Sequence, residues 1–273
     1  DRIGNSETGR VGVVLFPRNN PPSIGSDGLN LVRTGNQSTN QYARLTNIYL
    51  SSDKVTVAIW VKLHSLNTWQ RVFQLGNGLG SHVNSMIIAQ YYTSNQWGAG
   101  FTGSNYVSGL RGTDGPAGST GDTNNTTIST TTFQHIVWVL EGGAEHKLYI
   151  DGVLKQTNVT PTGSNYSHWG SGTPVNRKYN WIGESNYQSA TSTMDGEIKS
   201  VNIWDRALSA TEISTLHGYG RNYDISKFSS SSTSSPDQNL GDSFVLPEAT
   251  RSGHTIVGWS ASSTSDTPEV GYP

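Results

Sequence analysis

The chain has 273 residues, a formal net charge of −2, 14% charged residues and no cysteine. Without cysteine it forms neither disulfides nor thiolate metal sites, and without a basic stripe it has nothing to neutralise the phosphates of nucleic acid. Its apolar runs, such as 136–140, are far shorter than the roughly 18 residues of a membrane-spanning helix, which argues against membrane insertion.

Short β-rich runs begin at residue 42. The run 42–50 alternates well enough to form a strand, and 55–63 (VTVAIWVKL) is β-branched and apolar on nearly both faces, as expected of a core strand of a sandwich. Further strands are predicted at 69–75, 86–92, 97–101, 133–140 and 147–150. Their short spacing, with Gly, Ser, Thr and Asn in the connections, is typical of antiparallel strands joined by polar turns.

A tight turn follows the last of these strands. Asp151 and Gly152 supply the positive φ angles of a type I′ turn, which is the strongest local turn signal in the sequence. The run 147–150 is therefore predicted to form a hairpin with the residues that come directly after the turn.

A strand and a capped helix end the β-rich region. Residues 197–204 (EIKSVNIW) predict the strand, and Ser209 and Glu212 then have the spacing of a capping box. This predicts one short helix near 209–217, with Ile213 and Leu216 packed against the strands.

These segments resemble the laminin-G-like and pentraxin-like jelly rolls of the concanavalin A-like lectin/glucanase superfamily. The residues that carry the resemblance are VTVAIWVK, F.HIVWV with LYIDG, and IW.RALS..EI, in the order found in laminin-G-like domains across about 42–216. The resemblance implies an all-β antiparallel sandwich with one short helix and, by analogy, a carbohydrate-binding role.

The sequence divides into four parts. They are an N-terminal segment leading into the sandwich, the jelly roll itself, a serine-rich linker, and a partial repeat, at 1–41, 42–225, 226–240 and 241–273. The last part (LP.AT..G.T..GW) resembles the Listeria–Bacteroides repeat, a small β-rich module of bacterial surface proteins. Because the chain starts without methionine or an apolar leader, we expect a processed product or a piece of a longer polypeptide.

The expected catalytic motif of a glucanase of this fold is absent. Such an enzyme carries Glu-x-Asp-x-Glu on one strand, so that alternate carboxylates share a face. The nearest match runs from Thr193 through Asp195 to Glu197, with threonine where the attacking carboxylate would stand. There is also no Gly-x-Ser-x-Gly elbow. We therefore predict no catalytic residues and a protein that is not an enzyme.

Calcium is the cofactor that the resemblance implies, because many of these jelly rolls hold Ca²⁺ at the rim of the sandwich with oxygen ligands. The corresponding loop keeps Glu184 and Asn186, while a tyrosine stands where another carboxylate would sit. The candidate site is therefore a single ion held by Glu184 or Asp195 together with Asn186 and loop carbonyls. Polar turn residues bonded to their own backbone are the alternative. Asp114 and Asp122 form a second, weaker pair.

Glycan recognition needs aromatic faces for stacking on sugar rings and polar groups for their hydroxyls. Six aromatic or imidazole side chains lie in or beside polar segments and are the glycan-binding candidates: Trp97, Tyr106, Tyr166, His168, Trp169 and Tyr187. Trp60, Trp138 and Trp204 fall inside apolar strands and are assigned to the core. The apolar neighbours of Trp69 and Trp181 favour an inward position for both.

Together these features predict a non-catalytic adhesion module that binds a surface polysaccharide or glycoconjugate through its rim loops, at an extracellular or cell-surface location. Two alternatives remain open. One is a structural component of a virus particle or cell envelope, at the virion surface and in contact with other protein chains. The other is a polysaccharide-active enzyme of the same fold whose carboxylates do not follow the motif.

Overall fold

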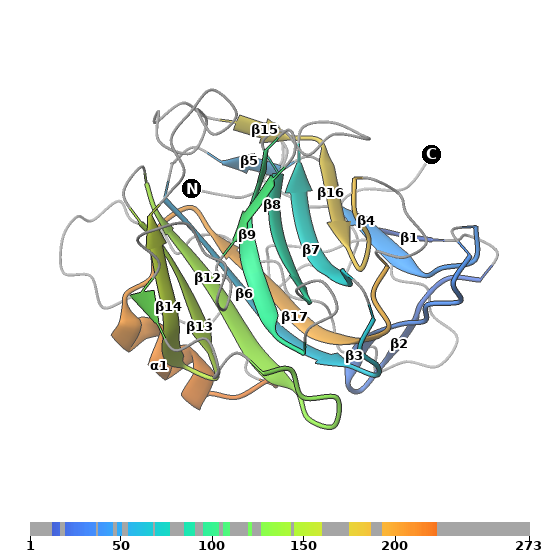
Figure 1. Cartoon of the computed structure of the whole chain (residues 1–273). Helices are drawn as coiled ribbons and strands as arrows, with labels where there is room; N and C mark the ends of the chain where they lie inside the picture. Colours follow the sequence, from blue (N-terminus) through green and yellow to red (C-terminus); the bar gives the residue numbers. More distant parts are fainter. Residues whose placement is uncertain are drawn as a thin grey trace, which may run out of the picture.

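The protein is an antiparallel β-sandwich in the computed structural model, which confirms the predicted fold class (Figure 1). The residues that the structure describes are 13–16, 20–36, 38–45, 48–50, 54–67, 69–76, 85–90, 95–103, 106–109, 120–121, 127–142, 145–159, 175–186 and 193–222. The predicted linker 226–240 and repeat 241–273 lie outside these residues. No helix in the described part is both long and apolar enough to cross a membrane.

Two large sheets and one small one make up the sandwich. Sheet A has the order β1 (Val13–Phe16), β4 (Tyr42–Leu45), β16 (Tyr179–Ile182), β7 (Arg71–Gly76), β8 (Ser85–Gln90), β9 (Trp97–Gly103) and β10 (Tyr106–Gly109). Sheet B has the order β11 (Thr120–Gly121), β14 (Val153–Val159), β13 (Glu145–Ile150), β12 (Gln134–Glu141), β6 (Lys54–Leu63), β17 (Gly196–Trp204), β3 (Gly28–Leu31) and β2 (Ser23–Gly25). A two-stranded sheet joins β5 (Ile48–Leu50) to β15 (Val175–Arg177).

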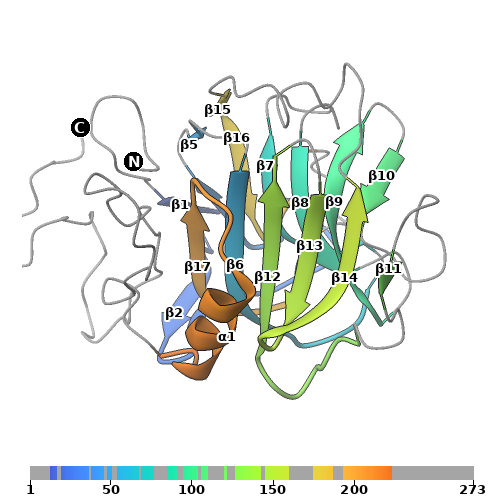
Figure 2. The same ribbon diagram turned by 90° about the vertical axis from the view of Figure 1, so that its left-hand side faces the viewer.

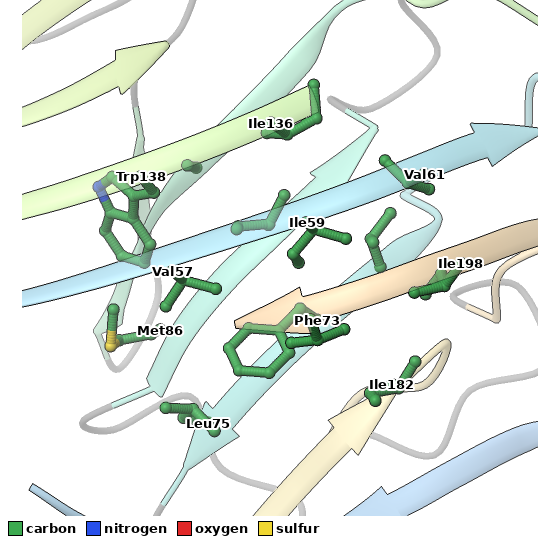
Figure 3. Packing of buried hydrophobic residues seen from close by; sticks show 14 of the residues in the cluster. Val57, Ile59, Val61, Phe73, Leu75, Met86, Ile136, Trp138, Ile182 and Ile198 are labelled. Atoms are coloured by element: carbon green, nitrogen blue, oxygen red, sulfur yellow. The ribbon is translucent and has the colours of Figure 1, made fainter. Parts of the chain in front are cut away.

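The core lies between the inner faces of sheets A and B. Val57, Ile59 and Val61 alternate along β6 and point toward sheet A, where Phe73 and Ile182 meet them (Figure 3). All five side chains are fully buried. The period-2 alternation of strand side chains therefore accounts for one face of the apolar run 55–63.

The helix α1 (Ala210–Gly218) covers the other face of β6, which explains why residues on that face of the run 55–63 are also apolar. It lies on the outer face of sheet B, in front of β6 and β17 in Figure 2. Ile213 and Leu216 pack there against a second apolar cluster that includes Ala58 and Trp204. The predicted capping box is present, because the Ser209 hydroxyl accepts the Glu212 N–H and the Glu212 carboxylate accepts the Ser209 N–H.

The predicted hairpin is also present. Asp151 and Gly152 have φ angles of 52° and 77°, as a type I′ turn requires, and they join β13 to β14. The Asp151 carboxylate accepts the backbone N–H of His135 at 2.8 Å, which ties the turn to β12.

Three predictions about strands and core need correction. The sandwich begins before residue 42, because β3 pairs with β17 and buries Leu29. The run 42–50 forms two strands in different sheets, β4 and β5, since alternation alone cannot reveal where a chain changes its pairing partner. Trp60 is half-buried and lies outside the core on the outer face of sheet B, with its ring stacked on His135 at 4.8 Å.

Candidate functional site

The outer face of sheet A carries a row of large polar and aromatic side chains. Directly opposed residues of antiparallel strands point to the same face, and β4, β16 and β7 place Arg44 opposite Trp181 and Trp181 opposite Gln74. Their chain neighbours Ala43 and Ile182 belong to the core, so this row points outward. The helix α1 covers sheet B, and in the described part of the chain no helix covers sheet A.

Trp181 is held in place by contacts with Asn186, Arg44 and Tyr42. Its indole N–H donates to Asn186 Oδ1 at 2.6 Å, and Asn186 donates in turn to Ser85 Oγ at 3.2 Å. The guanidinium carbon of Arg44 lies 5.5 Å from the centre of the indole, and the Tyr42 ring meets it edge-on at 5.7 Å. Arg44 itself is exposed, so this contact leaves its charge at the surface.

Arg71 lies on the same outer face, because it is paired with Ala89 of β8. Its side chain is 4% exposed. The guanidinium carbon lies 4.8 Å from the Trp69 ring, and Nη1 donates to the Trp69 carbonyl at 3.1 Å, whereas Nε has no partner. Burial lowers the pKa of Arg71 to about 10, although the nearby Glu184 acts in the opposite direction.

Trp69 adopts a backbone conformation that bulky residues rarely occupy. Its φ angle of 55° lies in the left-handed region, which costs about 1–3 kcal/mol for a residue other than glycine. The side chain is half-buried over the Arg71 guanidinium. Strain of this kind persists only where the surrounding structure imposes it, and such places are often ligand sites.

Glu184 is the carboxyl group of this region. Its side chain is 1% exposed, Oε1 accepts the Ser185 N–H at 2.7 Å, and Oε2 accepts the Thr193 hydroxyl at 3.2 Å. Burial raises the pKa of Glu184 to about 7, while these hydrogen bonds and the charge of Arg71 act against the rise. We call the following residues the outer-face cluster: Tyr42, Arg44, Trp69, Arg71, Trp181 and Glu184.

The buried carboxyl of Glu184 makes a testable contribution to pH-dependent stability. Its pKa is about 7 in the folded state against 4.5 for the free group, so the folded protein binds more protons between these values. This contribution to stability is present below pH 4.5 and is lost as the pH rises to about 7. We expect the Glu184→Gln variant to gain at least about 1 kcal/mol relative to the wild type across this window.

Denaturant unfolding of both proteins at several pH values measures this difference. The comparison with the wild type is needed because His135 also makes the stability depend on pH. Burial and the neighbouring His217 lower the pKa of His135 to about 3, so its contribution to stability below pH 6.5 changes with pH in the opposite direction. Glu145→Gln, at a more exposed carboxyl, controls for the substitution itself. A gap between wild type and Glu184→Gln that stays constant with pH contradicts the assignment.

The three residues predicted to bind calcium already use their oxygens within the protein. Both Glu184 oxygens accept protein donors, Asn186 Oδ1 accepts the Trp181 indole, and Asp195 Oδ2 accepts the Ser65 hydroxyl at 2.8 Å. Among the described residues, no group of three or more His, Cys, Asp and Glu side chains could hold a metal ion. This arrangement does not fit a shared calcium ion. Asp114 and Asp122 lie outside the described part.

The structure places two of the glycan-binding candidates on strands. Trp97 is 1% exposed in the core, where its indole donates to Gln134 Oε1 at 2.9 Å, and this corrects its predicted position on the rim. Its polar flanks misled the prediction, since Gly98 and Gln96 stand beside it in the chain. Tyr106 is on β10, and its side chain lies outside the described part. The other four candidates also lie outside it: Tyr166, His168, Trp169 and Tyr187.

Sequence reasoning missed Arg71 as a site residue. The signal was an arginine within the predicted strand 69–75, because a charge buried in a strand needs a reason. Trp181 was expected to face the core. It is buried, but it lies on the outer face of sheet A.

Residues 37–214 match the sequence model of Laminin_G_3, described as the concanavalin A-like lectin/glucanases superfamily. The chain belongs to this superfamily. No curated protein matches its sequence.

Solved structures with a similar fold share little sequence with this superfamily member. The CBM40 of Ruminococcus gnavus IT-sialidase bound to alpha2,3 sialyllactose is 16% identical, with a TM-score of 0.45, over 61% of this chain and 84% of that one. Domain 4 of the extracellular arabinanase AbnA from Geobacillus stearothermophilus, in complex with arabinotriose, is 17% identical, with a TM-score of 0.48, over 76% and 87%. A SAP-like pentraxin from Limulus polyphemus is 18% identical, with a TM-score of 0.44, over 64% and 72%.

Proposed function

We propose that this domain is a non-catalytic carbohydrate-binding module and that its ligand lies on the outer face of sheet A. One observation carries the proposal: half-buried Tyr42 and Trp69 flank buried polar groups on a sheet face that no described helix covers. Aromatic rings can stack on sugar C–H surfaces, and fixed polar groups can orient hydroxyls. Membership of the lectin/glucanases superfamily supports a carbohydrate ligand at the level of analogy.

The carboxylates nearest to the glucanase motif support the non-catalytic part of the proposal. Glu197 Oε2 forms an ion pair with Lys62 at 2.9 Å, and its Oε1 lies 3.0 Å from His64. Burial acts to raise the pKa of Glu197, but the hydrogen bonds with Lys62 and His64 lower it overall. Asp195 is engaged by Ser65. Glycosidases need two carboxyl groups flanking the substrate, whereas the outer-face cluster contains Glu184 alone.

Trp69→Ala is expected to weaken glycan binding about tenfold, because a stacked indole contributes more than about 1 kcal/mol at a binding site. A glycan array finds the ligand, and titration calorimetry with the full chain measures the loss. Tyr219→Ala removes an exposed aromatic beside α1, on the other side of the sandwich, and serves as the control. Unchanged affinity of Trp69→Ala places the ligand elsewhere, and silence across a broad array contradicts the proposed function.

The remaining parts of the hypothesis have direct tests. Release of reducing sugar from the bound polysaccharide would revive the enzyme alternative. Calcium dependence stays a prediction that the arrangement of Glu184, Asn186 and Asp195 does not favour, and repeating the titration with a chelator and with calcium added back tests it. An extracellular or cell-surface location accompanies the proposal, and the virion or envelope role remains its rival.

A further inference from the structure

Four arginines in the described part of this chain show two kinds of partner. Arg206 and Arg221 form ion pairs with Glu212 and Asp27, at 2.9 and 3.0 Å. Arg44 and Arg71, in the outer-face cluster, instead lie over tryptophan rings, and neither forms an ion pair with a described carboxylate. The outer face of sheet A therefore carries two cations that are set against aromatic rings and have no described carboxylate as an ion-pair partner.

The single carboxyl group of the cluster does not neutralise these two cations. Both oxygens of Glu184 are engaged by Ser185 and Thr193 and not by either guanidinium. Its pKa of about 7 also means that at neutral pH it carries only part of a negative charge. The outer-face cluster therefore has a net positive charge, although the whole chain has a formal net charge of −2.

The hydrogen bonding of Arg71 shows that its charge is left without a described acidic partner. Nη1 is used by the Trp69 carbonyl, while Nε is buried and has no partner. Because a buried guanidinium gains little from water, a negative charge nearby stabilises it. The accessible guanidinium of the pair is that of exposed Arg44, and its planar edge matches the two oxygens of a carboxylate better than it matches a hydroxyl.

We propose that the outer-face cluster selects sugars that carry a carboxylate, so that the ligand is an acidic glycan. This inference rests on the proposed function and deepens it. Arg44, exposed beside Trp181, meets the carboxylate at the surface, and the charge of Arg71 beneath Trp69 strengthens the attraction in a poorly solvated setting. Each guanidinium lies over a tryptophan ring, with its central carbon 5.5 Å (Arg44) and 4.8 Å (Arg71) from the ring centre.

Matched pairs of glycans test the charge preference. Oligogalacturonate, oligoalginate and heparosan oligosaccharides are each titrated into the full chain beside the same oligosaccharide with its carboxylates methyl-esterified. A glycan that carries sulfate groups but no carboxylates is included. We expect at least one free acid to bind about tenfold or more tightly than its ester. Arg44→Met, at an exposed position that does not threaten folding, should remove most of this preference.

Arg71→Met should act in the same direction, and its folding is checked by circular dichroism. Arg221→Met is the matched control, because Arg221 also lies over an aromatic ring, Phe133 at 4.5 Å, but has an acidic partner. Equal binding of acids and esters, or of neutral glycans only, overturns the acidic-ligand inference and leaves the binding function standing. Equal binding of the sulfated glycan overturns the choice of carboxylate, and binding of no glycan overturns both.

Discussion

Trp138→Ala is expected to lower the free energy of unfolding by about 3–5 kcal/mol, the range found for large aromatic residues removed from a core. Trp138 is fully buried on β12 and is among the largest such side chains in the described part. It belongs to the cluster between the two sheets, near Val57 and Met86 in Figure 3. Both sheets contribute to this cluster, so a cavity there cannot close without bringing two rigid layers together.

A second loss adds to the cavity. The Trp138 indole donates to His146 Nδ1 at 3.2 Å, and the two rings meet edge-on at 6.0 Å. His146 is also fully buried, so removal of the indole leaves that nitrogen without this donor inside the sandwich.

Chemical denaturation at constant pH measures the effect of Trp138→Ala. Trp138→Phe separates its two causes, because phenylalanine fills most of the volume but cannot donate to His146. Leu154→Ala, at a side chain that is 46% exposed on β14, should change stability by less than about 0.5 kcal/mol. A loss below about 1 kcal/mol for Trp138→Ala would mean that the two sheets are not packed as described.

Much of the fold could be predicted because its signals are local. The β-branched, apolar run 55–63 gives the central strand β6, Asp151 and Gly152 give a turn, and Ser209 with Glu212 gives the start of α1. Each depends on a few consecutive residues and on backbone geometry that the residue types favour. The short strands β1, β2 and β3 were missed, since three or four residues are too few for a pattern to rise above chance.

The candidate site could not be predicted in the same way, because it is assembled across strands. Arg44, Trp181 and Arg71 come from β4, β16 and β7, which are neighbours in sheet A but lie far apart in the sequence. Which residues share a face there depends on the register of two strand pairs, and a shift by one residue would turn Trp181 into the core. No composition or spacing within one segment contains that information.

Gly196 shows how a residue can be read in opposite ways from sequence and from structure. In the sequence, a glycine within residues 193–197 weakens the strand that a catalytic motif would need. In the structure, Gly196 is the first residue of β17 and pairs with both Leu63 of β6 and Leu31 of β3. Its lack of a side chain is what lets the backbone of β6 approach.

Gly196→Ala is therefore expected to lower the free energy of unfolding by about 3 kcal/mol, at the upper end of the usual cost of overpacking. A Cβ atom there would overlap the carbonyl oxygen of Lys62 and lie 2.9 Å from the Cα of Leu63. Both are backbone atoms of the central strand β6, which is fixed on its other side by β12. Neither neighbour can move aside without disturbing the hydrogen bonds of sheet B.

Gly25→Ala is the matched control, since Gly25 is also a strand glycine, on β2, and a Cβ there would have no neighbour within 4 Å. We expect this variant to remain within about 0.5 kcal/mol of the wild type. Thermal and denaturant unfolding of both variants compares them directly. Equal unfolding midpoints for Gly196→Ala and Gly25→Ala would show that β6 and β17, the two strands at the centre of the sandwich, are farther apart than described.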